Sequence, residues 1–377
     1  MLKTLIALAP LASHALAGAT PSYLNYTTVT GYFLQDEAST NASTFDYTAV
    51  NFGLINRTYD GVPAEGKTQW QQFAEEVARL NAAAPRGTSY KVLFLGRHAE
   101  GYHNAAESYY GTPAWNCYWS LLNGNGTVSW EDAHLTPAGT ASAQKAHNFW
   151  KHEIEVQKIP TPDVYYTSPL ARCLETASVT FGGLDLPASK PFVPTVKEYL
   201  REGISLHTCD HRSNKTWIQA AYPSFKIEPG FTEYDELWNG ITAESSTAQD
   251  VRSRAVLDSI LASSSCKTSP TYISITSHSG EISSILRVLG HRAFSLNTGA
   301  IIPVLVKVEK IAGTTTTAVA TYTTSAHCTV APLSSINGGA CVCPASATPV
   351  TSRLVTETPV VSPFTIFTPT AAAGQRR

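Results

Sequence analysis

Short apolar runs alternate with helical patterns along this chain, and that alternation limits the possible folds more than any other feature. The unbroken run Val92–Leu95 is typical of a buried strand in a parallel sheet. Similar runs predict strands over 163–166, 192–196, 271–276 and 300–308, and apolar spacing and capping residues predict helices over 67–81, 136–155, 168–181, 250–262 and 281–289. Residues 314–324 are expected to add an edge strand beside 300–308. Strands alternating with helices indicate an α/β fold with a mainly parallel sheet.

The 377 residues divide into segments of different composition. Residues 1–17 combine Lys3, an apolar run and Ala15-Leu16-Ala17, which indicates a secretory signal peptide that is too short to span a membrane. We expect a lead-in over 18–89 packing on a catalytic domain at 90–325. The Cys-containing and then Ser/Thr/Pro-rich segment 326–377 is expected to be disordered and ends without an anchoring signal.

Composition bears on the compartment and on the partners. Lys and Arg total 27 against 29 Asp and Glu, which argues against a nucleic-acid binder with a broad basic surface. Secretion would place N-glycans on loops at the sequons of Asn25, Asn41, Asn56, Asn125 and Asn214. Some of the seven cysteines should form disulfides outside the cell, and the odd number leaves at least one of them without an intramolecular partner.

Polar residues follow four of the predicted strands at their carboxyl ends, where open α/β sheets bind ligands. They include Arg97 and His98, then Arg172, then Glu202, and finally His278. A neutral imidazole is a nucleophile at mild pH, and arginine forks bind phosphoryl oxygens. The helix predicted after Ser279 adds backbone N–H groups suited to an anion, and a carboxylic acid at Glu202 would protonate the leaving oxygen. This set predicts phosphoryl transfer through a phosphohistidine.

Four segments, in the expected order over about residues 90–310, resemble the histidine phosphatase superfamily in its phosphoglycerate mutase-like branch. They are LFLGRHAEGYHN at 93–104, TSPLARCLETA at 167–177, LRE at 200–202 and TSHSGEI at 276–282. The resemblance implies a three-layer α/β/α sandwich and requires neither a metal nor a cofactor. It also implies catalytic roles for His98, Glu202 and His278 and substrate contacts from Arg97, Asn104, Arg172 and Ser279. His98 would be the phosphorylated nucleophile and Glu202 the proton donor.

Several positions depart from that family's pattern. Ala99 and Ser279 replace usual glycines, and Gly101 stands where mutases and many relatives have serine, so one phosphate contact is expected to be missing. The chain lacks the RHGxRxP form of the acid phosphatase and phytase branch. It is more similar to a fungal phosphomutase-like clade, in which CDHRS at 209–213 also finds matches. Glu100 and Glu198 remain alternatives to Glu202 as the proton donor.

Two further patterns leave alternatives open. His207, Cys209 and His211 form an H-x-C-x-H pattern that resembles metal ligands but lacks a fourth ligand, and Cys209 is also a candidate for a disulfide. Arg201, His207, Arg212 and Trp238 either shape the substrate site or belong to ordinary loop surface.

The sequence therefore predicts a secreted phosphomonoesterase that acts on a small-molecule phosphate ester. A phosphomutase using the same phosphohistidine is the alternative within phosphoryl-transfer chemistry. A catalytically inactive extracellular binding protein is the alternative outside it.

Overall fold

The computed structural model describes residues 21–261, 269–316, 318–332, 343–344 and 351–352. The expected signal peptide at 1–17 and most of the expected tail at 326–377 lie outside these ranges. The described chain forms a seven-stranded sheet in the order β1-β8-β2-β7-β3-β4-β5. These strands are β1 (Ser22–Thr28), β2 (Thr88–Arg97), β3 (Val164–Thr167), β4 (Thr195–Val196), β5 (Lys226–Ile227), β7 (Tyr272–Ser277) and β8 (Ile301–Ala312). The pairs from β2 to β5 are parallel, and only β1 and β8 add antiparallel pairs, which confirms a mainly parallel sheet.

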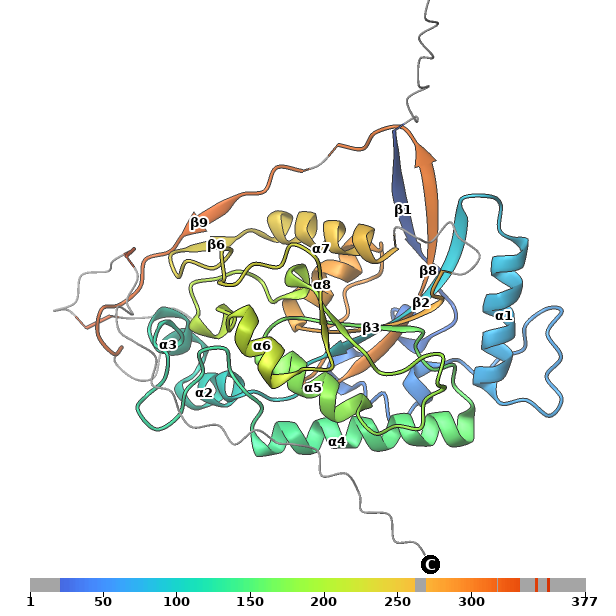
Figure 1. Ribbon diagram of the computed structural model, residues 1–377, viewed down its shortest axis with the longest axis horizontal. Helices are drawn as coiled ribbons and strands as arrows, with labels where there is room; N and C mark the ends of the chain where they lie inside the picture. Colours follow the sequence, from blue (N-terminus) through green and yellow to red (C-terminus); the bar gives the residue numbers. More distant parts are fainter. Residues whose placement is uncertain (1–20, 262–268, 317, 333–342, 345–350, 353–377) are drawn as a thin grey trace, which may run out of the picture.

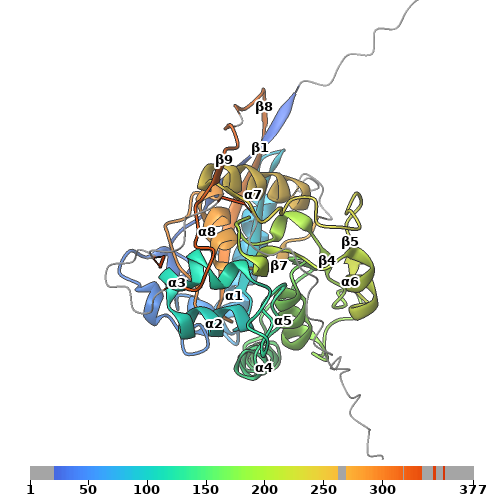
Figure 2. The same ribbon diagram turned by 90° about the vertical axis from the view of Figure 1, so that its left-hand side faces the viewer.

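Helices cover both faces of this sheet, as the three-layer prediction requires. In both views α7 and α8 lie on one side of the strands, and α4 and α5 lie on the other (Figures 1 and 2). The helices are α1 (Gln69–Ala83), α2 (Tyr102–Tyr110), α3 (Thr112–Cys117), α4 (Pro137–His152), α5 (Ala171–Phe181), α6 (Lys215–Ala221), α7 (Ser246–Leu261) and α8 (Ser279–Val288). Thr136 caps α4 by accepting a hydrogen bond from the Gly139 N–H at 3.0 Å, as its sequence position predicts.

The core is built around the central strands and extends into the lead-in segment. β7 is buried along its whole length, as a strand covered by helices on both faces should be. On the α4 side, the Phe94 ring of β2 lies 5.0 Å from the Trp150 ring of α4. Phe52 of the lead-in is fully buried and packs 4.9 Å from the same Trp150 ring. The lead-in therefore contributes aromatic side chains to the main core.

The expected edge strand at 314–324 is the main error in the predicted topology. The free edge of β8 is taken by β1, which pairs antiparallel with it from Ser22 opposite Ala312 to Thr28 opposite Val306. The chain after β8 instead runs over α7, and β9 (Tyr322–Thr324) pairs with β6 (Thr242–Glu244) in a separate small sheet (Figure 1). Sequence periodicity shows that a segment can form a strand, but its pairing partner depends on which edges remain unoccupied.

Beyond β9, cysteines lie close to α3. Cys328 forms a disulfide with Cys343, and the Cys117 Sγ lies 3.9 Å from the Cys328 Sγ. Cys173 and Cys209 are free and buried, so the disulfide considered for Cys209 does not form in this structure.

The described surface also bears on the expected glycans. Asn41, Asn56, Asn125 and Asn214 are exposed, whereas Asn25 is half-buried within β1, opposite Glu309, and does not lie on a loop as expected. Among the described residues, no helix combines the length and the apolar character needed to cross a bilayer.

Candidate active site

The parallel register of three strands brings the predicted site residues together. Arg97 at the end of β2 lies opposite Ser277 of β7, and Thr167 at the end of β3 lies opposite Thr276. The ladder continues one residue further, because the His98 N–H donates to the Ser277 carbonyl at 2.9 Å. The Ser168 N–H donates to the Thr276 carbonyl at 3.0 Å. His98, Ser168 and His278 therefore leave the sheet at the same edge.

His98 is held in the tautomer that a nucleophile needs. Its side chain is almost fully buried, and Nδ1 lies 2.7 Å from the Ala99 carbonyl oxygen, which accepts the Nδ1 proton. Nε2 has no hydrogen-bond partner among the described residues, and its lone pair is free. Burial, followed by the charges of Arg172 and Arg97, lowers the pKa of His98 well below its usual value. The ring is thus neutral near pH 7 and presents Nε2 as the nucleophilic atom.

Arg172 and His278 form a buried pair beside this nucleophile. Arg172 Nε donates to His278 Nδ1 at 3.2 Å, so the His278 proton lies on Nε2, which is 2.7 Å from the Ser168 Oγ. Arg172 Nη1 donates to the Cys209 carbonyl at 2.6 Å. The centroids of the His98 and His278 rings are 5.1 Å apart. A buried cation and a second imidazole, whose N–H faces the Ser168 hydroxyl, therefore lie next to the His98 ring.

Arg97 lies in the middle of the first motif, and Asn104 is its last residue. Arg97 Nη1 donates to the Leu296 carbonyl at 2.7 Å, while its Nε is buried without a hydrogen-bond partner. The Asn104 side-chain oxygen accepts the Gly101 N–H at 3.1 Å and caps the first turn of α2. Arg97 is thus anchored through Nη1 to the chain before β8, and Asn104 shapes the loop after β2 in this structure.

Glu202 occupies the N-terminus of α8. Its carboxylate accepts hydrogen bonds from the N–H groups of Gly280 at 3.2 Å and Glu281 at 3.1 Å, and from that of Gly203 at 2.9 Å. The Ser279 hydroxyl also donates to it at 3.4 Å. The backbone donors expected to bind a ligand anion are therefore paired with this side chain, as the positive end of a helix favours.

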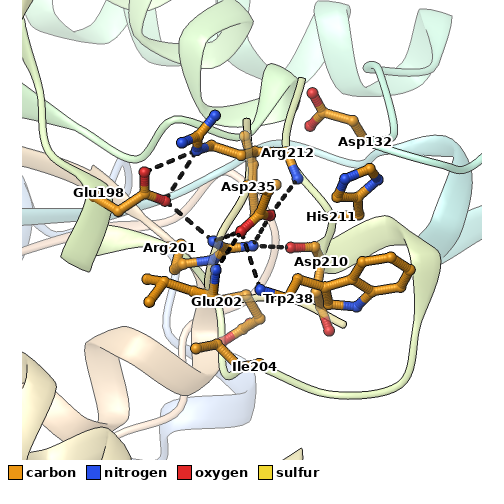
Figure 3. Close-up of polar contacts among 12 residues, drawn as sticks. Asp132, Glu198, Arg201, Glu202, Ile204, Asp210, His211, Arg212, Asp235 and Trp238 are labelled. Carbon is orange, nitrogen blue, oxygen red and sulfur yellow. Dashed lines mark hydrogen bonds and ion pairs between the residues drawn. The ribbon is translucent and has the colours of Figure 1, made fainter. Parts of the chain in front are cut away.

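A buried network of ion pairs holds the segment that carries these groups (Figure 3). The two nitrogens of Arg201 pair with the Asp235 carboxylate at 2.7 and 2.6 Å, and both side chains are fully buried. Arg212 pairs with Glu198 at 2.8 Å. Arg201 also donates to the Asp210 carbonyl, and the carbonyl of the preceding residue, Cys209, accepts from Arg172 Nη1. Arg201 and Arg212 are thus buried side chains that connect loops through ion pairs, and they do not belong to the loop surface.

The H-x-C-x-H pattern is only partly brought together. Ligand atoms of His207, Cys209 and Asp210 lie within 4.8 Å of one another, but His211 instead pairs with Glu131 at 3.1 Å and stacks on Trp238. The Asp210 carboxylate accepts the Ser205 hydroxyl at 2.6 Å and faces Arg172 Nη2 at 3.6 Å. Because this carboxylate is already engaged by protein donors, we assign no metal to the cluster.

The structure adds two residues to the site that the sequence reasoning did not assign. Ser168 bonds to His278, whereas the sequence predicts only that a helix begins at this residue. His103 lies within the first motif, and the centroid of its ring is 5.3 Å from that of His98. The position of His103 in the motif was the available signal.

Comparisons with known proteins agree with this geometry. Residues 93–299 match the family description "Histidine phosphatase superfamily (branch 1)". The chain is 49% identical over 304 residues to a "Probable phosphoglycerate mutase" of Arthroderma benhamiae, covering 80% of this chain and 89% of that protein. It is 35% identical over 290 residues to "Phosphomutase-like protein 3" of Candida albicans, covering 77% and 82%. A solved structure of the ecdysone phosphate phosphatase of Bombix mori overlaps 56% of this chain and 88% of its own, with a TM-score of 0.38 and 16% identity. The chain belongs to the histidine phosphatase superfamily, with phosphoglycerate mutase-like fungal relatives.

Proposed function

We propose that this protein is a secreted phosphomonoesterase that hydrolyses a small-molecule phosphate ester through phosphorylated His98. One observation carries the proposal. The Nε2 lone pair of a buried, neutral His98 has no donor among the residues that the structure describes, and it is flanked by Arg172 and His278. A structural histidine would instead have both ring nitrogens engaged or both in water.

The reaction follows from the placement of donors. His98 Nε2 attacks phosphorus, the bond to the ester oxygen breaks, and that oxygen leaves with a proton. Arg97, Arg172 and His278 stabilise the charge that spreads over the phosphoryl oxygens. Water then attacks the phosphohistidine and releases inorganic phosphate, which returns His98 to its starting state. Glu202 is the proton donor in this proposal, in keeping with its position in the third motif.

The nucleophile is tested by replacing it. Wild-type protein should release phosphate from an aryl phosphate in the presence of a chelator, and acid quenching should trap an acid-labile phosphoprotein. His98→Ala should abolish both signals, while His152→Ala, at an exposed position of α4, should leave both intact. Activity that survives in His98→Ala would overturn the assignment.

The proton donor has a separate test. Glu202→Gln should slow phosphorylation of His98 most for esters with poor leaving groups, because good leaving groups need little protonation. An equal loss for good and poor leaving groups would remove Glu202 from this role.

A phosphomutase remains the second candidate, because two fungal relatives carry mutase names. A mutase must retain its phosphoryl group and pass it to another hydroxyl, whereas a phosphatase passes it to water. Incubation with 3-phosphoglycerate and a catalytic amount of its bisphosphate distinguishes the two, since isomerised ester without net phosphate release would favour the mutase. A folded, glycosylated protein that is inactive on a broad ester panel would favour the inactive binding protein.

Secretion is also part of the proposal and rests on residues 1–17. Expression in a secreting fungal host should yield a mature chain starting near Gly18. We expect glycans at the exposed Asn41, Asn56, Asn125 and Asn214, with Asn25 less occupied because it is half-buried. An intact N-terminus on intracellular protein would refute this part.

A further inference from the structure

His103 is a buried histidine in the first motif that the proposed mechanism does not use. It is the second residue of α2, and only 8% of its surface is exposed. Its ring centroid lies 5.3 Å from that of His98. His103 belongs to α2, whereas His278 is the N-cap residue of α8. Among the described residues neither ring nitrogen has a hydrogen-bond partner; Nδ1 is sealed from solvent, whereas Nε2 is not. One ring nitrogen thus remains available to a ligand.

Gly101 explains how this ring fits beside the nucleophile. A Cβ at position 101 would lie 2.7 Å from His103 Nδ1 and 2.9 Å from Cε1, closer than real Cβ atoms approach other atoms. Any side chain there would push the ring away from its position. Gly101, which stands where many relatives have serine, therefore leaves the space that the His103 ring occupies.

The surroundings of the His103 ring determine which of its two nitrogens carries the proton. Nδ1 faces Gly101 and makes no hydrogen bond within the described part of the chain, and a buried N–H without an acceptor is costly. The proton is therefore on Nε2, which makes His103 a donor and His98, with its proton on Nδ1, a nucleophile. Burial, followed by the positive charges of Arg172 and Arg97, lowers the pKa of His103 well below its usual value. The charged neighbours that act on the ring are thus cations, which also attract an anion.

We infer that His103 is a substrate-binding residue whose Nε2–H donates a hydrogen bond to the phosphoryl group transferred to His98. The inference rests on the proposed function. It assigns to His103 the phosphate contact that is expected to be missing because position 101 is glycine and not serine. The ligand is a phosphoryl oxyanion, present in the ester, in the phosphohistidine and in inorganic phosphate.

Two substitutions at position 103 separate binding from packing. The terminal amide of glutamine reaches about as far as Nε2 and can donate from there, whereas the shorter asparagine amide corresponds to Nδ1. His103→Gln should therefore keep KM and the inhibition constant of inorganic phosphate within about threefold of wild type. His103→Asn and His103→Ala should raise both about tenfold or more, as expected for a lost hydrogen bond to a charged group.

Gly101→Ala provides a second, independent variant. Its Cβ should displace the His103 ring and raise both constants as His103→Ala does. Adding Gly101→Ala to His103→Ala should then cost little more, since the clash with the ring is gone and only a 3.2 Å contact to the His134 carbonyl remains.

Calorimetric titration with inorganic phosphate keeps this inference distinct from the proposed function, because it needs no turnover. Phosphate binding that weakens in His103→Ala and recovers in His103→Gln supports the inference, even if the enzyme proves inactive on esters. If the wild type is active, but wild type, His103→Gln and His103→Ala all bind phosphate with equal affinity, the inference is overturned and the proposed function stands. Equal losses in His103→Gln and His103→Ala, or no phosphate binding by wild type, also overturn it.

Discussion

Asp235→Asn tests whether the buried ion pairs hold the active-site segment in place. The substitution keeps the shape of the side chain and removes its charge, so Arg201 loses a two-point partner while both groups stay buried. The asparagine oxygen can still accept the N–H groups of Leu237 and Trp238, which bind Oδ1 of Asp235, but the Arg212 N–H, which binds Oδ2, loses its acceptor. The change therefore removes the charge of this residue together with one of its two acceptor oxygens.

The magnitude follows from the titration of Asp235. Burial alone raises its pKa, but the hydrogen bonds and charge of Arg201 outweigh burial and lower the pKa from 3.8 to about 2. Each pKa unit corresponds to about 1.4 kcal/mol, which gives about 2 to 3 kcal/mol for the charged form at neutral pH. Breaking a buried pair by removing one partner costs about 3 to 5 kcal/mol. We expect Asp235→Asn to lose about 3 kcal/mol of unfolding free energy.

Urea unfolding at pH 7 measures this loss, with Glu75→Gln as the matched control. Glu75 pairs with Lys67 at 2.6 Å but is 45% exposed, so its charge should contribute less than about 1 kcal/mol. A carboxylate whose folded-state pKa is lowered stabilises the fold above the unfolded pKa of 3.8 and loses that effect as pH falls toward about 2. The difference between Asp235→Asn and wild type should accordingly shrink between pH 5 and pH 3. Equal stability of Asp235→Asn and Glu75→Gln at pH 7 would refute the reasoning.

Two further predictions concern the first motif and its surroundings. Burial and nearby arginines lower the pKa of His98 below 6.5, whereas in His134 the hydrogen bond and charge of Glu175 outweigh burial and raise the pKa. In ring-proton NMR, His134 should take up its proton above pH 6.5 and His98 only well below it; titration of His98 above pH 6.5 would contradict the structure. Gly139→Ala should lower the unfolding free energy by about 1 to 3 kcal/mol, because the new Cβ would lie 2.0 Å from the Glu100 carbonyl oxygen. An unchanged midpoint of urea unfolding would contradict the close contact between Gly139 of α4 and Glu100 of the first motif.

The α/β class and the strands that carry the chemistry follow from the amino-acid pattern. Runs such as Val92–Leu95 are apolar on both faces, and only a strand covered on both sides by helices accommodates them. The carboxyl ends of parallel strands meet at one edge, so the positions of Arg97, His98, Arg172 and His278 were predictable without coordinates. The four motifs restricted that chemistry further, to one family.

The contacts that these side chains make depend on the tertiary structure and do not follow from the amino-acid pattern. Glu202 pairs with the N-terminus of α8, and Arg201 pairs with Asp235, 34 residues away in the sequence. The edge of β8 goes to β1 and not to residues 314–324, because the N-terminal strand pairs along most of it. Such outcomes depend on which donors, acceptors and strand edges remain unpaired after the chain has folded. Periodicity and motif spacing encode local preference, but they do not encode that competition.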